Sequence, residues 1–253
     1  MRTSLLRHTL RAYLDAGLEP RAALQVGGKV LDRGFDDLAT VILATYDPAG
    51  QSLRYASAGH PPPIFIGEGV DDPVTEASSP PLGAGVPTGL RQTTVGLPGG
   101  ATVCLFTDGL TEARRNGEMI GRRGLATMLA DLGEAPSAKR LIDHVATQVD
   151  RVFDDMAACI FRVEGEAPVP AYRVEELEVL SGDLATGTAG RFMLACGLSS
   201  AAAAAAVATT AGLLRRHHAA LVRVSFEGGR PSATVAPANV ENLAVATLRE
   251  LAG

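Results

Sequence analysis

The chain begins with two segments in which apolar residues recur every three or four positions, the spacing of an amphipathic helix. The apolar positions of the first segment, residues 2–16, are Leu5, Leu6, Leu10, Tyr13 and Leu14. Gly17 ends this helix, and Glu19-Pro20 begins a second helix that extends to about residue 31, because proline is tolerated in a first turn. The pattern therefore predicts a pair of helices at the start of the chain.

Short apolar runs rich in β-branched residues alternate with turn residues through the middle of the chain, and this pattern is typical of strands. Strands are predicted at residues 38–46, 52–58, 63–66, 91–97, 101–107 and 156–162. Two helices are predicted before the last of these strands, at residues 121–132 and 138–153. Residues 78–90, SSPPLGAGVPTGL, are rich in proline and glycine and are predicted to form a loop.

Residues 164–170, EGEAPVP, have the composition of a linker, and the pattern changes after them. The predicted elements beyond the linker are strands at 174–180, 221–226 and 232–235 and helices at 185–196, 199–217 and 240–251. The predicted fold class is α+β. We expect one domain over residues 1–163, the linker at 164–170 and a small α+β domain over residues 171–253.

Composition and charge narrow the classes of partner. A net charge of −5 argues against a general nucleic-acid binder, since such domains usually carry a basic surplus. No run approaches the roughly 18 to 20 apolar residues that a membrane span needs, so we expect no membrane association. The three cysteines lie far apart in apolar runs, which favours reduced thiols and a cytoplasmic location.

Acidic residues stand at the ends of two predicted strands. Asp108-Gly109 follows one apolar strand, and Asp154-Asp155 directly precedes another. Carboxylates at neighbouring strand ends can converge on one hard cation, which prefers oxygen ligands, and Gly109 would let the backbone turn away from the ion. Taken alone, an Asp-Gly pair after a strand is most often only a turn, so both interpretations stand at this point.

Four segments in order point to a known family. They are RYASAGHPPPIF at residues 54–65, SPPLG at 79–83, FTDGLTEAR at 106–114 and DDMAACIFR at 154–162. Together they resemble the metal-dependent PPM protein phosphatases, in the bacterial branch similar to SpoIIE, over roughly residues 3–163. The resemblance implies a β-sandwich of two stacked antiparallel sheets flanked by helices.

The resemblance also implies an activity, a cofactor and a partner. Family members remove phosphate from serine and threonine of partner proteins with two Mn²⁺ or Mg²⁺ ions. Carried over residue by residue, Asp108 and Asp154 would bind metal beside Gly109, and Asp155 would orient a ligand or water. The expected partner is a phosphorylated regulatory protein of the anti-sigma-factor antagonist type, and a second copy of the chain is a further candidate.

His60 has two interpretations. Within AGHPPP it would lie at a strand-to-strand corner that faces the metal site, where it could order a water or accept a proton near pH 7. Alternatively, His60 only hydrogen-bonds backbone at a tight corner, while Pro61 to Pro63 fix the backbone angle and block edge pairing. The structural interpretation of His60 is slightly favoured over the catalytic one.

Relatives carry further metal-binding aspartates before the first helix, in Gly-Asp-x-x-Asp and Gly-Asp-x-x-Gly-x-Gly segments. Here nothing precedes the helix, so we expect an N-terminal truncation and missing first strands. The early acids Asp15, Asp32, Asp36 and Asp37 do not match these motifs. The alternative function is therefore a catalytically inactive remnant that acts as a protein-binding regulatory module.

Residues 202–236 resemble, faintly, the histidine-kinase-like ATP-binding domain that often follows such phosphatases. The helix lacks the expected glutamate and asparagine, and no Asp-x-Gly follows the second strand. A small protein-interaction or dimerisation module is favoured over an ATP site.

Overall fold

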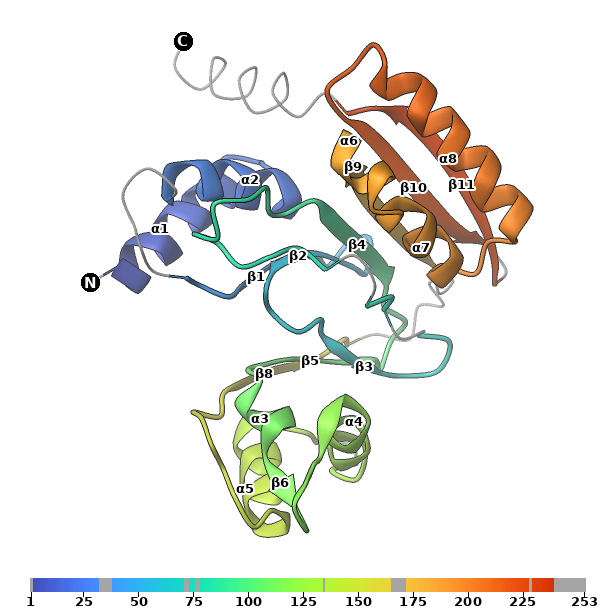
Figure 1. Ribbon diagram of the computed structural model, residues 1–253. Helices are drawn as coiled ribbons and strands as arrows, with labels where there is room; N and C mark the ends of the chain where they lie inside the picture. Colours follow the sequence, from blue (N-terminus) through green and yellow to red (C-terminus); the bar gives the residue numbers. More distant parts are fainter. Residues whose placement is uncertain are drawn as a thin grey trace. The chain divides into compact units, whose positions relative to one another are not determined.

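The computed structural model describes residues 2–31, 38–70, 73–75, 78–133, 135–164, 172–227 and 229–238 (Figure 1). Its helices are α1 (Arg2–Asp15), α2 (Pro20–Leu31), α3 (Gly109–Glu112), α4 (Gly121–Ala130), α5 (Ala138–Gln148), α6 (Ser181–Ala185), α7 (Thr188–Ala195) and α8 (Ser200–Leu214). Its strands are β1 (Val41–Asp47), β2 (Ser52–Ala58), β3 (Ile64–Ile66), β4 (Arg91–Gly96), β5 (Thr102–Phe106), β6 (Arg114–Arg115), β7 (Glu118–Met119), β8 (Ala158–Arg162), β9 (Arg173–Val179), β10 (Ala220–Glu227) and β11 (Arg230–Pro237).

The strands form three sheets. The largest has the order β1-β2-β4-β9-β10-β11, the second has the order β3-β5-β8, and β6 and β7 form a hairpin. The pairs β1–β2, β4–β9, β9–β10 and β10–β11 are antiparallel, as are β3–β5 and β5–β8. The predicted α+β class is thus confirmed, with antiparallel sheets. Among the described residues, no helix is both long and apolar enough to cross a bilayer.

The chain divides into two compact units. The first comprises residues 1–59, 74–95 and 172–253, and the second comprises residues 60–73 and 96–171. The first unit contains the six-stranded sheet with α1, α2 and α6 to α8. The second contains the three-stranded sheet, the hairpin and α3 to α5.

In the first unit, helices α1 and α2 pack against β1 and β2. Their amphipathic pattern is used as predicted, because Leu10 of α1 and Leu24 of α2 are fully buried with Ala56, Ala58 and Leu82. The alanine side chains of β2 keep this interface close.

Helices α7 and α8 pack on strands β9 and β10 in the same unit. Phe192 and Met193 of α7 are fully buried with Leu177 and Val179 of β9. Ser199 caps the N-terminus of the alanine-rich α8, because its hydroxyl accepts a hydrogen bond from the Ala202 amide at 3.2 Å. Its small residues suit the helix and let it lie close to the sheet.

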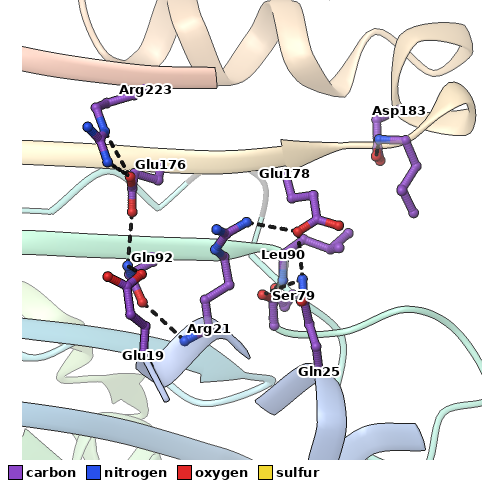
Figure 2. A network of polar contacts seen from close by, with 12 residues as sticks. Glu19, Arg21, Gln25, Ser79, Leu90, Gln92, Glu176, Glu178, Asp183 and Arg223 are labelled. Carbon is purple, nitrogen blue, oxygen red and sulfur yellow. Dashed lines mark hydrogen bonds and ion pairs between the residues drawn. The ribbon is translucent and has the colours of Figure 1, made fainter. Parts of the chain in front are cut away.

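Strand β9 carries glutamates that are buried and paired (Figure 2). Glu178 accepts hydrogen bonds from Arg21 of α2 at 2.8 Å and from Gln25 at 2.9 Å. Glu176 accepts from Gln92 of β4 at 2.9 Å and from Arg223 of β10 at 2.8 Å. Buried carboxylates are tolerated only when they are paired in this way. The network therefore ties β9 to a helix and a strand that come much earlier in the chain.

The second unit has its own core. Helices α4 and α5 contribute Leu125, Leu129, Leu141 and Val145, which are buried against Ile64, Cys104 and Phe106 of the three-stranded sheet. Ser137 begins α5, because its hydroxyl accepts a hydrogen bond from the Arg140 amide at 3.2 Å.

Several predicted boundaries were wrong. Helix α5 ends at Gln148 rather than at residue 153, because Val149 takes an extended conformation. The helix predicted at residues 185–196 is split into α6 and α7 at Gly187, whose φ of 71° is left-handed. The helix predicted at residues 240–251 and all but the first residue of the linker predicted at 164–170 lie outside the described residues.

Candidate functional site

Thr107 joins the two strand ends that carry the predicted carboxylates. It follows β5 directly, and its amide donates to the Ala157 carbonyl at 3.0 Å. Its hydroxyl donates to the Asp155 carbonyl at 3.0 Å and accepts from the Ala157 amide at 2.9 Å. The segment before β8 is therefore held alongside the segment after β5.

Gly109 packs against the backbone of the same segment. A Cβ atom at this position would lie 2.5 Å from the Asp155 carbonyl oxygen and 3.0 Å from that of Asp154. Both neighbours are backbone atoms, which cannot rotate away as a side chain can. Glycine is thus required here by close approach of two chain segments, in addition to any role in a turn.

Asp108, Asp154 and Asp155 are all exposed at these strand ends. The Asp154 carboxylate accepts a hydrogen bond from the Asp155 amide at 2.7 Å, which restrains its orientation. The Asp108 backbone carbonyl accepts from the amides of Thr111 and Glu112, both at 2.8 Å, and so begins α3. The structure therefore places the Asp108-Gly109 segment beside the Asp154-Asp155 segment, and the role of these carboxylates as metal ligands stays a prediction.

The glycine before His60 is fixed by the proline-rich loop. Gly59 has a φ of 66°, and its amide donates to the Ser79 carbonyl at 2.8 Å. A Cβ atom on Gly59 would lie 2.6 Å from Cγ of Pro81. The AGHPPP and SPPLG motifs, which are about 20 residues apart in sequence, thus meet at one corner.

The prolines after His60 are held through their carbonyl groups. Arg122 of α4 donates to the Pro62 carbonyl at 2.6 Å and to the Pro63 carbonyl at 2.5 Å. Prolines have no amide to donate, so these carbonyls are the groups available for anchoring the segment. The proline run therefore forms a fixed connection into β3.

His60 is half-buried near the end of β5. Burial lowers the pKa of its imidazole below the ordinary value, although a hydrogen bond with the Phe106 backbone and the negative charge of Asp108 act in the opposite direction. The ring is therefore mostly neutral at pH 7. This position has both features considered from sequence, contact with backbone and proximity to Asp108, and a catalytic role for His60 stays a prediction.

Carboxylates are the ligands that Mn²⁺ and Mg²⁺ prefer, but only Asp108, Asp154 and Asp155 were predicted here as candidate ligands. Across the part of the chain that the structure describes, no group of three or more His, Cys, Asp or Glu side chains could hold a metal ion. Asp15 lies in α1 and pairs with Arg11 at 3.5 Å, while Asp32, Asp36 and Asp37 lie outside the described residues. The described residues therefore do not fit a complete two-ion centre.

One part of this region was not predicted from sequence. Helix α3 and the β6–β7 hairpin follow Asp108. The backbone of Arg114 in the hairpin forms an isolated antiparallel β-bridge with the backbone of Arg151. The signal was present, because Asn116-Gly117 is a strong two-residue hairpin turn and both residues have left-handed φ values of 53° and 84°. The hairpin brings Arg114 beside the segment that leads to Asp154.

Comparisons with known proteins identify a family and similar folds. A family profile described as Stage II sporulation protein E (SpoIIE) matches residues 1–164. The fold is similar to that of the RsbU and RsbW domains of Rv1364c from Mycobacterium tuberculosis, with a TM-score of 0.51 and 20% identity over 92% of this chain and 71% of that chain. It is also similar to the SiaA-PP2C domain of Pseudomonas aeruginosa, with a TM-score of 0.51 and 23% identity over 63% of this chain and 68% of that chain.

A third structure, the Mn-presoaked phosphatase domain of the cell fate determinant SpoIIE from Bacillus subtilis, matches with a TM-score of 0.43 and 16% identity over 63% of this chain and 72% of that chain. The profile covers more than half of the chain, and the four motif segments named above lie inside it. Over residues 1–164, the chain belongs to the SpoIIE family of PPM-type protein phosphatase domains.

Proposed function

We propose that this chain removes phosphate from phosphoserine or phosphothreonine of a regulatory partner protein, as a metal-dependent phosphatase. The observation that carries the proposal is the packing of Gly109 against the backbone of Asp154 and Asp155. This contact holds Asp108 and the Asp154-Asp155 pair at adjacent strand ends, and His60 lies near Asp108. Such an arrangement suits recognition of a cation and of the phosphoryl group that the cation would accompany.

The proposed cofactor is Mn²⁺ or Mg²⁺, with Asp108 and Asp154 as ligands and Asp155 as an orienting group. Because the described carboxylates do not complete a two-ion set, turnover by the 253-residue chain requires ligands beyond them.

The proposed partner is a phosphorylated regulator of the anti-sigma-factor antagonist type. The fold likeness to a chain with RsbU and RsbW domains supports this proposal, because it covers 92% of the present chain and so extends past residue 164. We further propose a cytoplasmic location and a division into a phosphatase segment at 1–163, a linker at 164–170 and a small α+β segment at 171–253.

Hydrolysis of a phosphoserine peptide, with and without Mn²⁺, tests the proposed activity. We expect Mn²⁺-dependent release of phosphate by the 253-residue chain and its loss in Asp108→Asn, a change that removes one negative charge at similar size. Turnover that is unchanged in Asp108→Asn would exclude the assigned role of this carboxylate.

A second candidate function is a regulatory module that binds the phosphoprotein without hydrolysing it. The observation that favours it is the incomplete set of metal ligands among the described residues. A well-folded sample that binds a phosphoserine peptide but releases no phosphate with Mn²⁺ would establish this function instead.

A further inference from the structure

An exposed aromatic ring immediately before the candidate carboxylates has two arginines close to it. Phe153 is 55% exposed and directly precedes Asp154. The guanidinium carbon of Arg151 lies 5.1 Å from the ring centroid, and that of Arg114 lies 5.6 Å from it. We call these three residues the Phe153 platform. Neither its aromatic ring nor its cations take part in the core of the second unit.

The backbone around the platform is well anchored. The Arg114 amide donates to the Arg151 carbonyl at 2.9 Å, and the Asp150 amide donates to the Arg114 carbonyl at 2.8 Å. The Asp150 carboxylate accepts from the Asn116 amide at 2.5 Å, so it is used to hold the hairpin turn. The platform is therefore built on two backbone segments that are hydrogen-bonded to one another, and this backbone restrains the positions from which its side chains extend.

The electrostatics of the platform favour an anion. Two guanidinium groups share one ring, and their like charges repel each other unless a negative group lies between or beside them. Nη1 of Arg114 donates a hydrogen bond to the Gly117 carbonyl at 2.7 Å, and the guanidinium group has further N–H donors besides this one. Arginine is the side chain best suited to bind phosphate, because its donors match two oxygens at once.

The apolar surroundings favour a peptide over free phosphate. Val152 is exposed beside Phe153, and Met119 of β7 is exposed on the hairpin. Exposed aromatic and apolar residues next to arginine are the composition of protein-binding surfaces. An inorganic anion would use the cations alone, whereas a phosphorylated segment would use both the cations and the apolar side chains.

We propose that the Phe153 platform docks the phosphoserine- or phosphothreonine-bearing segment of the partner protein. Arg114 and Arg151 attract the phosphorylated segment by its negative charge, and Phe153 packs on the residues beside the phosphorylated one. The platform offsets the repulsion that exposed Asp108, Asp154 and Asp155 exert on the same anion. This inference rests on the proposed function and names the residues that determine recognition of its substrate.

Fluorescence anisotropy with a labelled alanine-rich peptide tests the platform. The peptide carries one phosphoserine, its twin carries serine, and EDTA is present so that no turnover removes the phosphate. For the full chain we expect the phosphopeptide to bind about tenfold more tightly than its twin, as a charge-assisted arginine contact implies. Arg151→Gln should lose most of this difference, and Phe153→Ala should weaken binding of both peptides.

Arg123→Gln is the matched control, because it removes the same charge from an exposed position on α4. Its affinities should equal those of the unmodified chain. Arg151→Lys keeps the charge but loses the planar group, so its affinity for the phosphopeptide should fall between those of the unmodified chain and Arg151→Gln. Far-ultraviolet circular dichroism and the urea midpoint of each variant show that it is folded.

The possible outcomes separate the two proposals. If the unmodified chain prefers the phosphopeptide but folded Arg151→Gln and Phe153→Ala bind it equally well, the platform inference is overturned while the proposed function stands. If the unmodified chain does not distinguish the two peptides in EDTA, the platform inference is overturned, and the separate test of Mn²⁺-dependent hydrolysis decides the proposed function. Equal losses in Arg151→Gln and Arg123→Gln would reduce the effect to net charge and also overturn the platform.

Discussion

The buried ion pair between Arg21 and Glu178 should make a large contribution to stability that depends on both partners. Their side chains are 11% and 9% exposed, and the guanidinium nitrogen lies 2.8 Å from the carboxylate oxygen. Removing one partner of such a pair usually costs about 3–5 kcal/mol, because the other charge stays buried without compensation. In Arg21→Met, Glu178 keeps the amide of Gln25 at 2.9 Å, so we expect a loss near the lower limit, about 3 kcal/mol.

The double variant Arg21→Met/Glu178→Leu should recover most of this loss. Replacing a buried ion pair by apolar residues of similar volume is often neutral, since the cost of removing two charges from water disappears. Gln25 would retain the Gly89 carbonyl as an acceptor at 3.4 Å. We therefore expect the double variant to lie within about 1 kcal/mol of the unmodified chain.

Urea unfolding followed by far-ultraviolet circular dichroism measures these differences, because the chain has no tryptophan and only four tyrosines for fluorescence. The matched control is Asp143→Asn, which breaks a surface pair with Lys139 whose side chains are 60% and 83% exposed. It should cost no more than about 0.5 kcal/mol. The reasoning is refuted if Arg21→Met costs less than about 1 kcal/mol, or if the double variant is as unstable as the single one.

Three further predictions concern the second unit. Gly109→Ala should lower the free energy of unfolding by about 1–3 kcal/mol, because its Cβ would overlap fixed backbone. Gly182→Ala, where nothing lies within 4 Å, is its control from the first unit and should be neutral or stabilising, as urea midpoints will show. Burial raises the pKa of the Cys104 thiol to about 12, so a thiol reagent at pH 8 should modify the exposed Cys159 and reach Cys104 only after unfolding. In the variant Cys159→Ser, which lacks the exposed thiol, fast modification of Cys104 in the folded protein would contradict this prediction. Burial also lowers the pKa of His60 in the folded chain, so the unfolded state binds more protons and stability should decrease as the pH falls below about 6.5. Urea midpoints between pH 5 and 7.5 should vary less with pH in His60→Asn than in the unmodified chain. An equal dependence of the midpoint on pH in both proteins would disprove the lowered pKa of His60.

Much of the fold was predictable because the strand signals are local. The β-branched run at residues 38–46 and the apolar run at 101–107 correspond to β1 and β5 within a few residues. The glycines and prolines of the corner before β3 also mark a real change of direction, since Gly59 requires a left-handed φ. Periodicity and turn chemistry act over a few residues, so they are readable without knowledge of the fold.

The burial of the β9 glutamates was not predictable from the same signals. The sequence VEELEV at residues 174–179 suggests a solvated strand, because glutamate is rarely buried. Glu175 is nevertheless fully buried, since it pairs with Arg91 at 2.9 Å and accepts from Thr93 at 2.6 Å. These partners are more than 80 residues away in the chain. Only the strand pairing of β4 with β9 brings them together, and no local pattern encodes that pairing.

The end of the family match at residue 164 does not coincide with an end of physical contact. Strand β4 lies inside the matched segment, and β9 outside it pairs with β4 from Arg91 to Val95. Without β9, the backbone groups of β4 on that edge would have no strand partner, and the buried polar groups of α2 and β4 would lose their carboxylates. The pairing therefore links residues on both sides of residue 164. Strand β9, which follows residue 164, is part of the same sheet as β4 and supports the segment that matches the family.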